Sequence, residues 1–198
     1  MNDSLLNPKH IEVIQNFENL LEQGIANQTM SDIASSLKVS LRTLYEIAPS
    51  KEKLVISTID RILTNIAKQA LTSLKNMDSS VGKLRTFTKI GNEAAGPRIQ
   101  KYAVDLSRIK GADDMIKSHE TAYIEHIKRL LDEAADNNEI EIVDNRAVAI
   151  MLGTVARVFT KKNHQEKLSA SAEESANMIS GLIIDGLSIH RVFQQQDF

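Results

Sequence analysis

The sequence predicts an all-α protein with an N-terminal helix-turn-helix head of three helices and a C-terminal helical bundle, about nine helices in all. Apolar residues recur at helical spacing along most of the 198 residues, and no segment has a convincing strand pattern. Only 3 prolines and 8 glycines interrupt this spacing. With 42% hydrophobic and 25% charged residues, the composition suits a helical protein with a sizeable core.

The first helix is predicted to begin near Pro8 and to end at Gly24. Proline is favoured in the first turn of a helix, and glycine is common just after the last turn. Ile14, Phe17 and Leu21 share one face at helical spacing. We therefore expect this helix to support the next two helices from behind.

Residues 29–54 contain three helix starts, and this crowding is typical of very short helices packed together. Thr29 is a good N-cap and is followed three residues later by Asp32, at the position of the reciprocal capping acid. After a short turn, Ser40 can cap a second short helix, and Ser50 can cap the start of a long one. This spacing predicts a helix-turn-helix that leads into a long helix.

The remaining chain has the pattern of long amphipathic helices followed by two helices that are apolar nearly all round. The expected ranges are 51–74, 80–90, 97–109, 115–134, 144–162 and 172–192. We place the domain boundary after the helix-turn-helix, which gives a head of residues 1–54 and a body of residues 55–198.

The last two predicted helices are expected to form a dimer interface. A helix that is apolar on two faces must be covered on both, so we expect this pair to meet its two-fold copy as a four-helix bundle. The expected interface residues are Met151, Val155, Val158, Ile179, Ile183 and Leu187. The alternative is a fully buried hairpin in a monomer.

A spaced pattern of residues in the first 60 positions carries a family resemblance. It consists of Gly24, Thr29, Met30, Ile33, Ala34, Val39, Ser40, Thr43, Leu44, Tyr45, Ser50, Lys51, Glu52 and Leu54. With these residues the chain resembles the TetR family of bacterial transcriptional regulators. Lys38 departs from the family pattern, which has glycine in the turn. Ile47 and Ala48 also depart from it, because the family usually has His or Tyr followed by Phe there.

The resemblance implies a homodimeric repressor that binds a palindromic operator in double-stranded DNA and is released by a small apolar or amphipathic ligand. In a docked helix-turn-helix, the first residues of the second helix face base edges; here these are Leu41, Arg42 and Thr43. Arg42 is the best base reader because its guanidinium can bond guanine O6 and N7 together. The other expected DNA contacts are Thr29, Ser40, Tyr45 and Lys51, assigned to phosphates, and Lys38.

The charge distribution gives only local support to DNA binding. The formal net charge is −2, and residues 1–53 carry five basic against seven acidic side chains. Between residues 38 and 53 the balance is four basic to two acidic. An attractive field is therefore confined to the second short helix and the start of the long one. We expect few phosphate contacts per subunit, so dimerisation should matter for affinity.

The sequence contains none of the common catalytic or metal-binding motifs, so we expect no enzyme activity, no cofactor and no metal. It has no cysteine, no glycine-rich phosphate loop and no H-E-x-x-H zinc motif. Helical periodicity places the ligand pocket of the body at Ile66, Phe87, Tyr102, Met115, His119, Tyr123 and Met151. For His119, a hydrogen-bonded core histidine is the alternative.

Two other classes of protein stay open at this point. A small-molecule carrier bundle would show no DNA binding, and a helical enzyme would lose turnover on mutation of His119. The first residues lack the pattern of a signal peptide, and the longest apolar runs are about half a membrane span. We therefore expect a cytoplasmic protein with no membrane partner.

Overall fold

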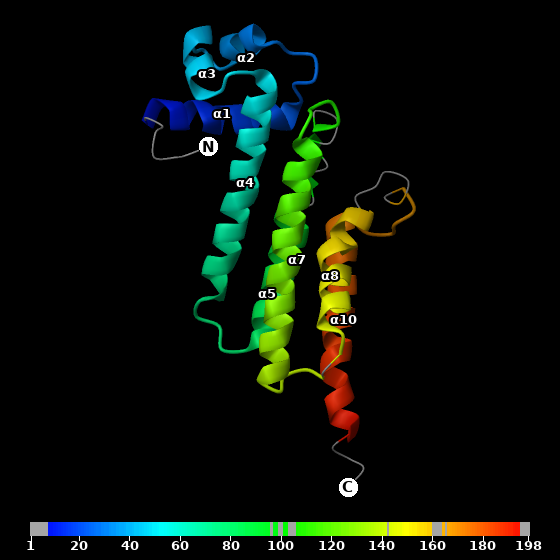
Figure 1. Ribbon diagram of the computed structural model, residues 1–198. Coiled ribbons are helices and arrows are strands. Elements are labelled where there is room, and N and C mark those ends of the chain that lie inside the picture. Colours follow the sequence, from blue (N-terminus) through cyan, green and yellow to red (C-terminus); the bar gives the residue numbers. More distant parts are fainter. Residues whose placement is uncertain are drawn as a thin grey trace. The chain divides into compact units, whose positions relative to one another are not determined.

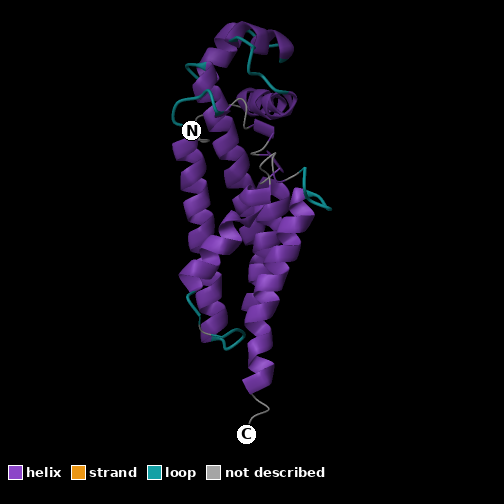
Figure 2. Ribbon diagram, turned by 90° about the vertical axis from the view of Figure 1, so that its right-hand side faces the viewer, coloured by secondary structure: helices purple, strands orange, loops and turns teal. Residues whose placement is uncertain are grey.

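The computed structural model describes residues 8–95, 97–98, 101–102, 106–141, 143–159, 164 and 166–194. Within them all regular secondary structure is helical (Figure 1, Figure 2), which confirms the all-α prediction. The elements are α1 (Pro8–Gln23), α2 (Met30–Ser36), α3 (Leu41–Ile47), α4 (Lys51–Leu74), α5 (Ser80–Ile90), the π-helix η2 (Gly91–Ala95), α7 (Ala112–Asp136), α8 (Asn145–Phe159) and α10 (Ala172–Gln194). Residues 99, 100 and 103–105 of the helix predicted over 97–109 lie outside the described residues, as do residues 160–162 of the helix predicted over 144–162.

Helix α1 ends where the sequence predicts. Gly24 has a φ of 87°, in the left-handed region that favours glycine, and its N–H donates to the carbonyl of Leu21 at 3.0 Å. Phe17 and Leu21 are fully buried on the inner face of α1. The helix therefore contributes an apolar stripe to the core of the N-terminal region.

The two short helices of the helix-turn-helix begin at the predicted caps. Both halves of a capping box are present at α2, because the Thr29 side chain accepts from the Asp32 N–H and the Asp32 carboxylate accepts from the Thr29 N–H. At α3, the Ser40 hydroxyl accepts from the Thr43 N–H at 3.0 Å. Helix α2 packs on α3 (Figure 1), so the helix-turn-helix prediction is confirmed.

The turn between α2 and α3 contains a lysine in a left-handed conformation. Lys38 has a φ of 55°. Its N–H donates to the carbonyl of Ser35 at 3.1 Å, and the Val39 N–H donates to the carbonyl of Ala34 at 3.0 Å. This is the Schellman pattern of hydrogen bonds that closes many helices, usually with glycine at the left-handed position. Lys38 therefore has the backbone conformation for which the family has glycine.

The chain divides into two compact units. One comprises Met1–Thr64 and Arg98–Lys117, and the other comprises Asn65–Pro97 and Ser118–Phe198. Helices α4 and α7 thus each supply residues to both units. The division into a head of residues 1–54 and a body of 55–198 stays a functional prediction.

The second unit has its own apolar core, built from α5, α7, α8 and α10. Helix α10 packs against both α8 and α5. The fully buried residues of this core include Leu84, Ile127, Leu131, Ala134, Ala149, Leu152 and Ile184. An ion pair between Arg85 and Asp185, 2.6 Å apart, also connects α5 with α10 at the surface. Among the described residues, no helix is both long enough and apolar enough to cross a membrane.

Candidate nucleic-acid interface

Helix α3 has one buried face and one face exposed to solvent. Leu44 and Ile47 are buried in the core, while the side chain of Arg42 is 89% exposed and Tyr45 is 50% exposed. Leu41, at the first position of the helix, is also exposed. The structure therefore brings Leu41, Arg42 and Tyr45 to one outward surface, as expected for a helix that enters a DNA groove.

The exposed guanidinium of Arg42 is held by a glutamate of the same helix. Arg42 Nε donates to Glu46 Oε1 at 3.0 Å, and Glu46 Oε2 lies 3.7 Å from Nε2 of His10 on α1. The spacing of four residues places the two side chains one turn apart on the same face of α3. No role for Glu46 is predicted from the sequence, although its spacing of four residues from Arg42 is a local signal.

The predicted phosphate-binding hydroxyls also serve the helix caps. Thr29 Oγ1 donates to Asp32 Oδ2 at 2.7 Å, and the hydroxyls of Ser40 and Thr43 lie 2.7 Å apart. The hydrogen bond from the Thr29 backbone holds the pKa of Asp32 below its ordinary value, with the Thr29 hydroxyl adding to the effect. These hydroxyls are exposed at the N-termini of α2 and α3, where backbone N–H groups favour anions.

Lys51 contacts its own chain more extensively than the sequence predicts. Its Nζ donates to the carbonyls of Ile25, Ala26 and Gln28 at 2.7, 3.0 and 2.7 Å. An ammonium group has three N–H donors, and these three contacts use all of them. The geometry favours a role for Lys51 in fixing the segment between α1 and α2. No local signal in the sequence indicates this, because the partners are 23–26 residues away.

The two other departures from the family pattern are packing residues in this chain. Ile47 and Ala48 are both buried, at 5% and 3% exposed. Neither side chain is available to DNA. Ile47 instead fills core space at the end of α3, together with the fully buried Leu44.

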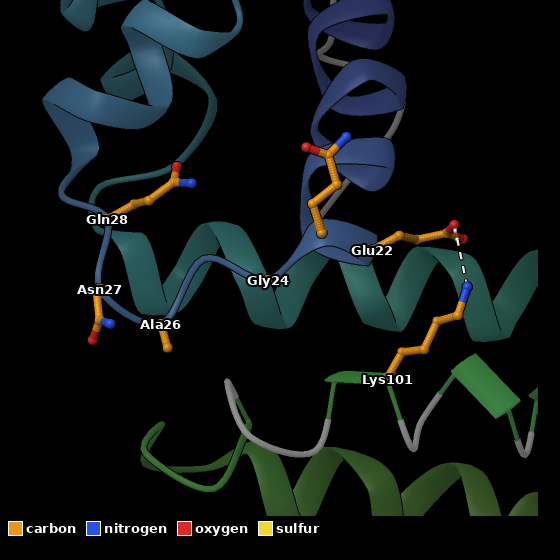
Figure 3. Close-up of a pocket in the computed structure, with 7 residues that line it drawn as sticks. Glu22, Gly24, Ala26, Asn27, Gln28 and Lys101 are labelled. Atoms are coloured by element: carbon orange, nitrogen blue, oxygen red, sulfur yellow. Dashed lines mark ion pairs between the residues drawn. The ribbon is translucent and has the colours of Figure 1, made fainter.

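A polar pocket lies in the first unit, at the C-terminal end of α1 (Figure 3). Its volume is about 490 Å³, and its lining residues are Glu22, Gln23, Gly24, Ala26, Asn27, Gln28 and Lys101. Glu22 and Lys101 form an ion pair across it, with Lys101 Nζ 3.6 Å from Glu22 Oε2. None of the predicted ligand-pocket residues lines this pocket, and its lining has no large hydrophobic or aromatic side chain of the kind expected for an apolar ligand.

Part of the predicted ligand-binding set forms an aromatic cluster in the second unit. The rings of Phe87 and Tyr123 stack with centroids 5.1 Å apart, and the His126 ring lies 4.4 Å from that of Phe87. The Tyr123 hydroxyl donates to the carbonyl of Thr88 at 3.3 Å, and burial raises the pKa of Tyr123 well above its ordinary value. A Cβ on Gly91 would overlap this hydroxyl, so glycine at the start of η2 allows the close approach.

The other members of the predicted pocket set are not all brought together. Tyr102 and Met115 belong to the first unit, whereas Ile66, His119 and Met151 belong to the second. Ile66 is buried and His119 is half-buried, but Met151 is 59% exposed. The position of Met151 fits the predicted interface better than a pocket. No group of three metal-ligating side chains occurs among the described residues.

Helices α8 and α10, which pack together, both carry exposed large apolar side chains. The α8/α10 apolar face consists of Ile150, Met151, Val158, Met178 and Leu182, and the last two are 59% and 62% exposed. Of the predicted interface residues, Met151 and Val158 lie on it. Val155 is buried, and Ile179, Ile183 and Leu187 are half-buried. Helical periodicity indicated that these helices are apolar on two faces, but it could not tell which face the unit's own core covers.

The fold is shared with solved structures of transcriptional regulators. A TetR transcription regulator from Haloarcula marismortui has 15% identity over 90% of this chain and 97% of its own, with a TM-score of 0.74. A TetR-family regulator from Agrobacterium tumefaciens has 12% identity over 92% of this chain and 100% of its own, with a TM-score of 0.70. The regulator FadR from Bacillus subtilis, solved in complex with stearoyl-CoA, has 16% identity over 89% of this chain and 98% of its own, with a TM-score of 0.71.

The similarity to these regulators lies in the fold and is not detected in the sequence alone. No family model matches the chain, and no curated protein matches it. The likeness in three dimensions nevertheless covers both compact units, because the matched regions include about nine-tenths of the chain. With its capped helix-turn-helix and helical second unit, the chain has the fold of the TetR-family transcriptional regulators.

Proposed function

We propose that this protein is a cytoplasmic, homodimeric transcriptional repressor that binds a palindromic operator in double-stranded DNA and is released by a small apolar or amphipathic ligand. The observation that carries DNA binding is the outward face of α3, where Arg42 projects into solvent beside Leu41 and Tyr45. A short helix with exposed residues at its N-terminus can enter the major groove. The shared fold of known regulators supports the same role.

The contacts to DNA divide into base reading and positioning. Arg42 donates two parallel hydrogen bonds to O6 and N7 of a guanine, and Leu41 contacts a thymine methyl group. The phosphate contacts come from Tyr45, Lys38 and the N-termini of α2 and α3, where Thr29, Ser40 and Thr43 lie. Lys51 contributes indirectly in this proposal, because its ammonium holds the segment that leads into α2.

The α8/α10 apolar face supports a homodimer. An exposed apolar surface of this kind is unfavourable in water and typical of protein interfaces, and a two-fold axis pairs it with its own copy. A charge at its most exposed residue, Leu182→Asp, should give a monomer in sedimentation experiments at micromolar concentration. Leu71→Asp, at an exposed leucine of α4 outside the face, is the matched control and should leave the dimer intact. A monomeric native protein would contradict the proposal.

The ligand is proposed to bind the second unit and to weaken DNA binding. One neighbour in fold was solved with stearoyl-CoA, which makes a long-chain acyl thioester the first compound to test. Helices α4 and α7 supply residues to both units, so a change in either helix can affect both. Coupling between two such sites is typically about 1–3 kcal/mol. We expect stearoyl-CoA to make the free energy of operator binding less favourable by an amount in this range.

The direct test is a gel shift on the promoter DNA next to the protein's own gene. The native protein should give a retarded complex that unrelated DNA competes for poorly. Arg42→Ala should lose preference at one base pair per half-site, at a cost of roughly 1–3 kcal/mol per subunit. Equal weakening on all sequences would contradict base reading by Arg42. Failure of the native protein to bind any DNA would favour a carrier bundle.

A further inference from the structure

We infer that Glu46 is a positioning residue for base recognition, which fixes the edge of the Arg42 guanidinium that faces DNA. This inference rests on the proposed function and adds to it a second residue that determines sequence specificity. Three observations carry it: the hydrogen bond from Arg42 Nε to Glu46 Oε1 at 3.0 Å, the exposure of both side chains, and the position of His10 Nε2, 3.7 Å from the same carboxylate.

The hydrogen bond selects one edge of the guanidinium. An arginine can present two parallel N–H donors from the edge that contains Nε or from the edge formed by its two terminal nitrogens. In this chain Nε is already donating to Glu46. The edge left for a guanine is therefore the terminal one, which still has the two parallel donors that O6 and N7 require.

The carboxylate of Glu46 lies between Arg42 and His10. Glu46 Oε1 accepts from Arg42, while Oε2 lies 3.7 Å from His10 Nε2, and the His10 side chain is only 14% exposed. His10 belongs to α1, a longer helix with a buried apolar face, and attracts the carboxylate when its ring is protonated. An 89% exposed arginine would otherwise lose much side-chain entropy when it binds a base. Glu46 lowers that loss by restricting Arg42 before DNA arrives.

The negative charge of Glu46 should also raise the specificity of DNA binding. A carboxylate on the groove-facing helix repels phosphates and weakens binding to DNA of any sequence. Its hydrogen bond to Arg42 becomes stronger when the groove excludes water. Glu46 therefore lowers non-specific affinity and raises the discrimination between operator and other DNA.

The test compares base preferences in a selection from a pool of randomised DNA duplexes. We expect Glu46→Ala to lower the preference for guanine at the position read by Arg42 roughly three- to tenfold, the effect of one lost hydrogen bond. Glu46→Gln should recover part of it, because an amide oxygen can accept from Nε. Glu12→Gln, at an exposed glutamate of α1, removes the same charge and should raise affinity for all sequences without changing the preference.

The outcomes separate this inference from the proposed function. If the native protein selects a site, Arg42→Ala alters it and Glu46→Ala leaves the base preferences unchanged, the positioning role is wrong while DNA recognition stands. If Glu46→Ala changes a base pair that Arg42→Ala does not, Glu46 reads a base itself and the inference is also wrong. If the native protein selects no sequence, both fall together. Thermal unfolding of each variant confirms that the fold is retained.

Discussion

Lys38 has a backbone conformation that suits glycine better than lysine. Its φ of 55° places the Cβ close to the following carbonyl, at a cost of about 1 kcal/mol or more. We predict that Lys38→Gly raises the free energy of unfolding by up to about 1 kcal/mol. Urea unfolding checks this, with Lys38→Ala as the control because it removes the charge but keeps the Cβ. Equal stability of the two variants would show that the turn is not strained.

Lys51 offers a second test at the scale of one residue. Lys51→Met keeps the length of the side chain but removes the ammonium donor from the carbonyls of Ile25, Ala26 and Gln28, of which Ile25 keeps the bond from the Gln28 N–H. We predict a loss of about 1–3 kcal/mol in the free energy of unfolding. Lys53→Met, at an exposed lysine in the same turn of α4, should change it by less than about 0.5 kcal/mol. Unchanged stability with weaker DNA binding would restore the phosphate role that the sequence predicts.

These two lysines illustrate what the sequence could and could not predict about single residues. The left-handed conformation of Lys38 followed from the glycine that the family has at this position. The contacts of Lys51 did not, because its partners are backbone carbonyls distant in sequence. Backbone carbonyls have the same chemistry in every residue, so only the folded path of the chain determines which of them a cation meets.

At the scale of elements, Glu139 stabilises the start of α5. Its carboxylate accepts from the Ser79 hydroxyl at 2.6 Å and from the N–H groups of Ser80 and Val81 at 2.8 and 2.9 Å. Burial alone would raise the pKa of Glu139, but the hydrogen bonds from these groups outweigh it and hold the pKa below its ordinary value. The carboxylate after α7 thus satisfies donors that the first turn of α5 leaves free.

The lowered pKa gives a pH-dependent prediction. A carboxyl group whose pKa is lower in the folded state stabilises the fold above its unfolded pKa, and the contribution disappears as the pH falls through the folded pKa. Glu139→Ala should therefore lower the free energy of unfolding by about 1–2 kcal/mol at neutral pH. The difference from the native protein should shrink below the ordinary glutamate value of 4.5.

Urea unfolding at a series of pH values measures this difference. Asp136→Asn, at an exposed carboxylate near the end of α7, is the control and should change stability little at any pH. A Glu139→Ala penalty that stays constant into acid would mean that the hydrogen bonds to the ionised carboxylate contribute nothing.

The sequence located most elements but not the interactions between them. Helix starts at Thr29 and Ser40 followed from local capping chemistry, which acts over three residues. The hydrogen bond between Glu139 and Ser79 joins residues 60 positions apart, so no local sequence pattern predicts it. For the same reason periodicity found two apolar helices at the C-terminal end but could not show that Ile183 and Leu187, two of the predicted interface residues, also pack against the unit's own core.

At the scale of the whole molecule, low net charge shapes the proposed function. With a formal charge of −2, the protein cannot depend on a broad positive surface for binding DNA. Affinity must come from two heads acting together, spaced about one DNA turn apart, roughly 34–36 Å. The proposal therefore links the α8/α10 apolar face to DNA binding, because loss of the dimer removes half of the contacts from each complex.

Methylation interference on the bound operator tests the central claim, that the outward face of α3 reads DNA. A methyl group at guanine N7 removes the acceptor that a bidentate arginine requires. We predict that methylation of one guanine in each half-site blocks binding of the native protein and has no effect on the residual binding of Arg42→Ala. Binding that no guanine methylation affects, or the same interference pattern for both proteins, would contradict the account.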